Sequence, residues 1–146
     1  MREVLSLLPG DGDILNRFGQ LEMLARDLHR AERYFNEVLK LDPKNLDARF
    51  SMGLLRLKQF RFEHARRIFE TLAAEHPQKD KDLVYFNLGL AELAQGEIAA
   101  AKSYFRQAYY LSNTKNTLAR EFAEHDYSVY SKSEIQQIII NGALPS

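Results

Sequence analysis

Apolar side chains recur along the chain in steps of three and one, the spacing that places residues on one face of an α-helix. Two kinds of segment carry this pattern, and they alternate along the chain. The first kind contains an internal glycine, and its apolar residues are Leu15, Phe18, Leu21, Met52, Leu55, Tyr85, Leu88 and Ala91. The second kind contains an alanine four residues before a phenylalanine, and its main apolar residues are Ala31, Phe35, Val38, Ala65, Phe69, Leu72, Ala101, Phe105 and Ala108. The pattern predicts pairs of helices and no strands.

The helix pairs repeat with a nearly constant period of 34 residues, lengthened once to 36. Three triplets of identical residues share this spacing: Gly19, Gly53 and Gly89; Ala31, Ala65 and Ala101; Phe35, Phe69 and Phe105. Pro43 and Pro77 are also 34 residues apart and are expected to end the second helix, because the residue before proline avoids the α region. The two extra residues fall in the polar segment 76–82, where an insertion costs little.

A glycine that recurs inside a helix needs a physical reason, since glycine costs about 1 kcal/mol relative to alanine there. Close approach of the paired helix supplies one. We therefore expect the two helices of each pair to cross at Gly19, Gly53 and Gly89, with the alanine of the second helix as the small partner in the crossing.

This pattern closely resembles the tetratricopeptide repeat, a 34-residue unit with glycine in its first helix, alanine and phenylalanine in its second, and a terminal proline. Segment 95–101 also resembles the turn between the two helices of that family. Two positions depart from the family pattern: Arg49 replaces a large apolar or aromatic residue, and Asn113 replaces the terminal proline. The resemblance implies an all-α fold, a right-handed superhelix of antiparallel helix pairs, with partial repeats at both ends.

The register of the repeat divides the chain into five segments. They are the tail of a truncated repeat at 1–11, full repeats at 12–45, 46–81 and 82–115, and a degenerate repeat or C-terminal capping helices at 116–146.

The N-terminal segment is in register with the end of a second helix. Residues 3–11 align with 37–45, so that Val4 and Leu5 stand where Val38 and Leu39 stand one repeat later. Because a repeat array buries its core only between neighbours, we expect the chain to be a piece of a longer protein. The alternative is a short native capping helix.

The C-terminal segment continues the register and then adds an isoleucine-rich stretch. Ser133 and Gln136 form a weak capping-box signal for a short helix that Asn141-Gly142 would end. The helix carries four isoleucines, at Ile135, Ile138, Ile139 and Ile140. It is expected to cap the array as a degenerate fourth repeat. The less favoured alternatives are that the isoleucines fold into the protein's own groove or engage a second subunit.

The resemblance implies that the first helices line a concave face, where a peptide or helix would bind. We name as groove positions the residues three before, one after and four after each repeated glycine. They are Asn16, Gln20, Met23, Phe50, Leu54, Leu57, Phe86, Leu90 and Leu93. The first repeat offers mainly amides and the next two an apolar strip, with Phe50 and Phe86 as aromatic anchors. Packing between adjacent repeats is the equally weighted alternative for this strip.

The groove lacks the cations with which some co-chaperones of this family hold a peptide's terminal carboxylate. The matching positions carry Asn16, Gln20, Ser51, Leu83 and Asn87. Without Lys or Arg, the charge-assisted hydrogen bonds of such a receptor are absent. An apolar or amphipathic protein segment is therefore the expected partner.

Composition narrows the remaining classes of function. Basic and acidic residues both number 20, so the chain has no net charge to attract nucleic acid. The second repeat is mildly basic, which makes RNA binding a distant third hypothesis. There is no cysteine, the four histidines lack metal-ligand spacing, and no catalytic motif is present, so we expect neither cofactor, metal nor enzymatic activity.

Two functions follow as expectations. The first is a non-catalytic scaffold that binds a protein segment in its groove. The second is a structural helical arm of a larger secretion, envelope-assembly or modifying-enzyme complex. The chain has no apolar run approaching the roughly 20 residues of a membrane span and no signal peptide. The default compartment is therefore the cytoplasm, or the periplasm for a fragment of an exported protein.

Overall fold

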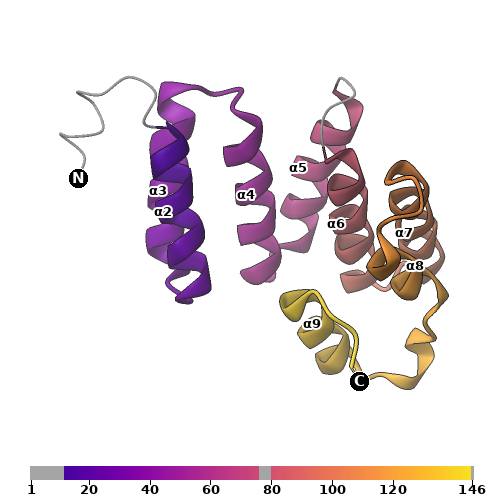
Figure 1. The fold of residues 1–146 in the computed structure, drawn as a ribbon. Helices are drawn as coiled ribbons and strands as arrows, with labels where there is room; N and C mark the ends of the chain where they lie inside the picture. The colour runs from indigo at the N-terminus through magenta and orange to yellow at the C-terminus, as the bar shows by residue number, and fades with distance from the viewer. Residues whose placement is uncertain (1–11, 76–79, 146) are drawn as a thin grey trace. The chain divides into compact units, whose positions relative to one another are not determined.

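The computed structural model describes residues 12–75 and 80–145, and all regular structure within them is helical (Figure 1). The helices are α2 (Gly12–Leu24), α3 (Leu28–Leu41), α4 (Leu46–Lys58), α5 (Phe62–Ala74), α6 (Lys81–Ala94), α7 (Ile98–Leu111), α8 (Thr117–Glu124), the 3₁₀ turn η1 (Tyr127–Val129) and α9 (Lys132–Asn141). The prediction of an all-α chain built from helix pairs is confirmed. The truncated repeat predicted at 1–11 and the helix end predicted at Pro77 lie outside the described residues.

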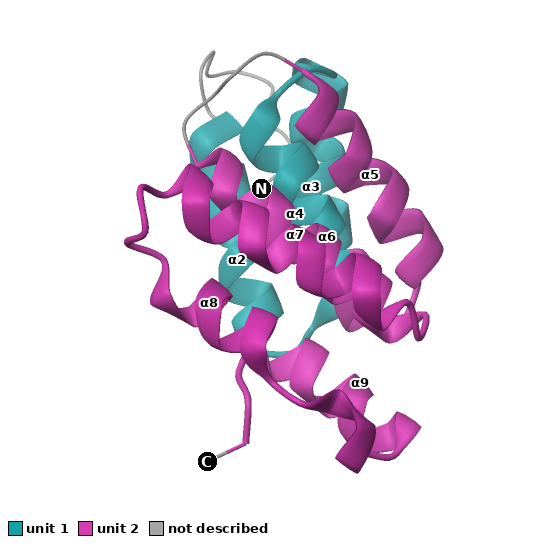
Figure 2. Ribbon diagram, turned by 90° about the vertical axis from the view of Figure 1, so that its right-hand side faces the viewer, with its two compact units in different colours: residues 1–55 teal, residues 56–146 magenta. Residues whose placement is uncertain are grey.

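The chain divides into two compact units, residues 1–55 and 56–146 (Figure 2). The first unit contains α2, α3 and most of α4. The second contains the last turn of α4 and the helices from α5 to α9. Each unit has its own buried side chains, and each is described separately.

The first unit is centred on residues from three helices. Leu15 of α2, Val38 of α3 and Ala48 of α4 are fully buried together, and Tyr34 and Leu39 pack against them. All five lie at apolar positions of the helical pattern. Burial of such a stripe removes apolar surface from water, which is the main force that pairs amphipathic helices.

The repeated glycine allows the paired helix to approach closely. A Cβ atom added to Gly19 would lie 2.4 Å from Cε1 of Phe35, and one added to Gly89 would lie 2.4 Å from Cε1 of Phe105. The predicted close approach is therefore confirmed at these two positions. The three nearest atoms belong to the phenylalanine ring of the second helix, a contact that was not predicted. The role of the alanine as the small partner stays a prediction.

The second unit is centred on three aromatic rings. Phe86 of α6, Phe105 of α7 and Phe122 of α8 have ring centroids 5.0 to 5.4 Å apart in each pairing. Phe86 and Phe122 meet edge to face at 77°, an arrangement that aromatic pairs favour. The cluster ties α8 to the third helix pair.

After α8 the chain turns back through η1 before it forms α9 (Figure 1). Tyr127 is buried, and its hydroxyl donates a hydrogen bond of 2.5 Å to the carbonyl oxygen of Phe122. The rings of His125 and Tyr130 stack at an interplanar angle of 10°. His125 Nε2 also lies 2.7 Å from the Tyr130 hydroxyl, within hydrogen-bond distance. These contacts hold the turn that precedes α9.

The start of α9 differs from the prediction by two residues. Its N-cap is Ser131, whose hydroxyl accepts from the backbone N–H of Glu134, while the Glu134 carboxylate accepts from the backbone N–H of Ser131. The prediction of a capping box from Ser133 to Gln136 was wrong, because a glutamate at the third position satisfies the N-cap amide and adds a favourable charge at the helix N-terminus. The predicted end is confirmed: α9 stops at Asn141, and Gly142 is left-handed with φ of 62°.

Candidate functional site

The groove positions of the first unit are only partly open to solvent. Asn16 and Met23 are buried, Phe50 and Leu54 are half-buried, and Gln20 is exposed. Gln20 Nε2 donates to the Ser51 hydroxyl at a distance of 3.4 Å. Phe50, Leu54 and Gln20 are therefore the groove positions of this unit that are not buried.

Asn16 is a polar residue at the position that phenylalanine occupies in the next two repeats. Its side-chain oxygen is buried and accepts no hydrogen bond from the part of the chain that the structure describes. A buried acceptor without a donor is unfavourable. The structure offers no compensating contact that explains the asparagine.

The groove positions of the second unit are all buried. They are Leu57, Phe86, Leu90 and Leu93. Phe86 contacts the rings of Phe105 and Phe122, so it is a core residue and its ring is not free to anchor a partner. Leu90 is 3% exposed, whereas Leu54 is half-buried and Gln20 exposed at the same place in the register. The same repeat position thus has three different environments.

Helix α9 packs against α6, the helix that carries Leu90. Ile138 and Ile139 are each 3% exposed, and Ile135 and Ile140 are half-buried. At one end of α9, Lys58 Nζ donates to the carbonyl oxygen of Ile140 at 3.3 Å. The isoleucines of α9 are thus partly or fully buried in the second unit, and whether they occupy the predicted groove stays a prediction.

The positions at which a carboxylate receptor would carry cations are engaged within the chain. Asn87 Nδ2 donates to the carbonyl oxygen of Leu83 at 2.8 Å, one turn earlier in α6. Ser51, as noted, accepts from Gln20. The Asn87 amide is therefore engaged within its own helix and the Gln20 and Ser51 groups with each other, whereas the Asn16 oxygen has no donor among the described residues.

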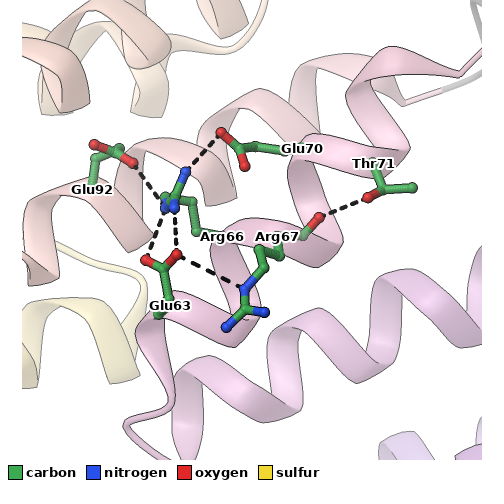
Figure 3. A network of polar contacts seen from close by, with 6 residues as sticks. All are labelled: Glu63, Arg66, Arg67, Glu70, Thr71 and Glu92. Atoms are coloured by element: carbon green, nitrogen blue, oxygen red, sulfur yellow. Dashed lines mark hydrogen bonds and ion pairs between the residues drawn. The ribbon is translucent and has the colours of Figure 1, made fainter.

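A polar network joins α5 to α6 in the second unit (Figure 3). Arg66 contacts three carboxylates: it is hydrogen-bonded to Glu63, its Nη1 lies 2.9 Å from Glu70 Oε2, and its Nε lies 3.7 Å from Glu92 Oε1. Arg67 Nε also lies 3.8 Å from Glu63 Oε1. The arginine therefore bridges two acids of its own helix and one of the next.

The network shifts its acids in opposite directions. The hydrogen bond from Arg66 lowers the pKa of Glu63, which lies at the surface. Burial raises the pKa of Glu92, and the positive charge of Arg66 opposes that rise only in part. The pairs within α5 follow the i, i+3 and i, i+4 spacing that a sequence shows, but the contact with Glu92 depends on how α5 and α6 pack.

Several cations of the mildly basic second repeat are engaged by neighbouring groups of the chain. Arg66 is paired with carboxylates, Arg56 Nη1 donates to Gln59 Oε1 at 2.7 Å, and Lys58 donates to Ile140. Cations held by neighbouring acceptors are poorly placed to contact phosphates, which weighs against the RNA-binding hypothesis.

We expect Arg66→Met to lower the free energy of unfolding by about 1 to 2 kcal/mol at pH 7, because it leaves three carboxylates close together and Glu92 mostly buried. Glu92→Gln is the matched control. Since the raised pKa of Glu92 makes the folded state bind more protons, stability falls as the pH rises above the ordinary value of 4.5. Glu92→Gln should remove that slope and leave stability at pH 7 unchanged or higher, as measured by urea unfolding. Equal losses in both variants would contradict this account.

Other sites are not evident in the described ranges. Residues 12–75 and 80–145 contain no cluster of three His, Cys, Asp or Glu side chains arranged to hold a metal ion. Within the same ranges no helix combines the length and the apolar character that crossing a membrane requires.

Comparison with protein families gives two matches, both to models described as tetratricopeptide repeat, over residues 22–88 and 83–115. Comparison with curated proteins and with solved structures gives no match. The matched residues run from the last turn of α2 to the turn that follows α7. The chain belongs to the tetratricopeptide repeat family.

Proposed function

We propose that this chain is a non-catalytic interaction scaffold that binds an amphipathic helix of a partner protein on the first helices of its repeats. Tetratricopeptide repeats are generally protein–protein interaction modules. The observation that supports the finer proposal is α9, an isoleucine-bearing helix of the chain itself that packs against α6.

The chemistry of α9 indicates what this surface accepts. Ile135, Ile138 and Ile139 are spaced by three and four residues and so lie on one face of the helix. Glu134, which precedes them in the sequence, and Gln137, which lies between Ile135 and Ile138, are polar and exposed. Recognition of an amphipathic helix by an apolar surface depends on anchors with this spacing. The expected partner therefore carries branched apolar residues at i, i+3 and i+4.

In this proposal α9 is an internal occupant that competes with the partner. A tethered segment behaves as a ligand at an effective concentration on the order of millimolar. A partner helix would bind with an apparent affinity reduced by the fraction of molecules whose surface is open. In the first unit, contact of the partner helix with Gln20, Phe50 and Leu54 stays a prediction.

The test uses a fluorescent peptide of residues 131–142 as the probe and the full chain as the receptor. The variant Ile138→Asp/Ile139→Asp should release its own α9 and bind the peptide at least about tenfold more tightly than the wild type, as measured by anisotropy. A peptide that carries the same two aspartates is the matched control and should not bind.

A second receptor variant distinguishes specific binding of the peptide to the α6 surface from non-specific hydrophobic binding. Adding Leu90→Gln to the released variant places a polar group at the centre of the α6 surface and should abolish peptide binding. Circular dichroism must show both receptors to be equally helical. If the Ile138→Asp/Ile139→Asp variant is folded and does not bind the peptide, the proposal is wrong.

A structural arm of a larger assembly is the second candidate. The specific observation in its favour is an apolar side of α2 that the described residues leave uncovered. That surface differs from the one contacted by α9.

A further inference from the structure

The turn between α4 and α5 carries a large side chain in a strained backbone conformation. Arg26, Phe60 and Gly96 stand at the same register position, in the turns between paired helices, and their φ angles are 66°, 62° and 80°. This left-handed region suits glycine, whereas a bulky residue there is an outlier. The local backbone therefore disfavours Phe60 at a position where the third repeat has Gly96.

The surroundings of Phe60 do not compensate for this strain. Its side chain is 51% exposed, although its ring lies 5.8 Å from the ring of the half-buried Phe62, centroid to centroid. The next residue, Arg61, is exposed and is the N-cap of α5, where it makes no capping hydrogen bond with its side chain. A positive charge is also unfavourable at a helix N-terminus. Two adjacent residues that both oppose local stability are typical of an interaction site.

The turn places an exposed aromatic ring between two cations. Lys58 and Arg61 flank Phe60 in the sequence, and we call residues 58–61 the basic turn. Lys58 donates its hydrogen bond to a neutral backbone carbonyl. The nearest carboxylate in the sequence, that of Glu63, is hydrogen-bonded to Arg66. A surface complementary to the basic turn would therefore combine an apolar pocket with carboxylates.

The second unit contains a pocket of this kind. The pocket lies between α8 and the residues that follow α9, and its volume is about 450 Å³. Its lining includes three apolar residues, two acids and a histidine: Leu118, Leu144, Pro145, Glu121, Glu124 and His125. Both glutamates are exposed. Pockets of roughly 300 to 1,000 Å³ enclose small organic ligands, so this one can admit a phenyl ring.

We infer that the chain associates with itself by placing the basic turn of one copy in the acidic pocket of another. The Phe60 ring packs against the apolar lining, and Arg61 pairs with Glu121 and Glu124. The pocket is lined by no residue of the basic turn, so the turn of the same copy does not fill it. The inference does not rest on the proposed function, because neither surface includes a groove position.

The first test measures the mass of the full chain by sedimentation from about 10 µM to about 1 mM, the range expected for a small interface. The mass should rise with concentration. Phe60→Gly should weaken the association at least about tenfold, as loss of an aromatic anchor does. Its melting temperature should be unchanged or higher by a few degrees, because glycine suits a φ of 62°.

Arg26→Gly is the matched control for Phe60→Gly. It relieves the same kind of backbone strain in the first unit, at the same register position, and removes a side chain outside the basic turn. It should leave the association unchanged.

A charge exchange identifies the second surface. Arg61→Glu and, in a separate protein, Glu121→Arg/Glu124→Arg should each abolish the association, because like charges then face each other. An equimolar mixture of these two proteins should associate again, since each turn meets a pocket of opposite charge on the other protein. The restored association should weaken as salt is added.

The inference is wrong if the wild-type chain stays monomeric over the whole concentration range, or if Phe60→Gly associates as the wild type does. It is also wrong if the mixture of the two charge variants stays monomeric while circular dichroism shows both to be folded. A lower melting temperature for Phe60→Gly would assign the ring a structural role and would contradict the inference as well.

Discussion

Replacing Phe105 with alanine is expected to lower the free energy of unfolding by about 3 to 5 kcal/mol. Phe105 is fully buried, and its ring contacts Phe86 and Phe122. It also lies against the backbone of Gly89. Removing the ring leaves a cavity at a point where three helices meet, and rigid helices cannot close it fully.

The contact between the ring and Gly89 can be tested by a double-mutant cycle. An alanine Cβ at Gly89 would lie 2.4 Å from the ring, so Gly89→Ala should cost about 1 to 3 kcal/mol in overpacking, offset by about 1 kcal/mol of helix propensity. Phe105→Leu makes room for the new methyl group. The double variant should therefore lose about 1 kcal/mol less than the sum of the single losses in urea unfolding.

Gly96→Ala is the matched control for this cycle. Gly96 has φ of 80°, and an added Cβ would meet nothing within 4 Å, so its cost comes from backbone strain alone. Gly96→Ala and Phe105→Leu should be additive. If Gly89→Ala and Phe105→Leu were additive as well, the glycine would not be retained for contact with the ring.

The repeated residues were sufficient to predict the helix pairs, because each pair follows local rules. The 34-residue spacing located Gly19 and Gly89, and glycine in a helix required a close contact. The pattern could not show that the contact is with Phe35 or Phe105, since ring orientation depends on tertiary packing. The two-residue error at Ser131 has a different cause, because Ser131 and Glu134 have the spacing of a capping box in the sequence itself.

The groove positions show where periodicity stops being informative. Gln20, Leu54 and Leu90 are equivalent in the register, yet only Leu90 is buried. The register cannot show this difference, and it does not predict that α9, distant in sequence, packs against α6. Phe86 was likewise expected to be an anchor, but α8 brings Phe122 against its ring. A periodic pattern identifies the side of a helix and does not identify what covers it.

Tyr127 is buried in the turn that precedes α9, and Tyr127→Ala is expected to lower the free energy of unfolding by about 3 to 5 kcal/mol, as for other large buried aromatic residues. Tyr127→Phe keeps the ring and loses only the hydrogen bond to the carbonyl of Phe122, so it should cost about 1 kcal/mol. The two variants separate the packing of the ring from the hydrogen bond that its hydroxyl donates.

Tyr127 lies in the turn through which the chain passes from α8 to α9, so its loss should loosen α9 before it unfolds the helix pairs. Hydrogen exchange of Tyr127→Ala should show faster exchange in α9 and in the α6 turns around Leu90, with α2 and α3 unchanged. Tyr127→Phe should keep near-normal protection in both. Uniformly faster exchange throughout the chain would mean that the tyrosine supports the whole fold, and that the contact of α9 with α6 does not open as a separate step.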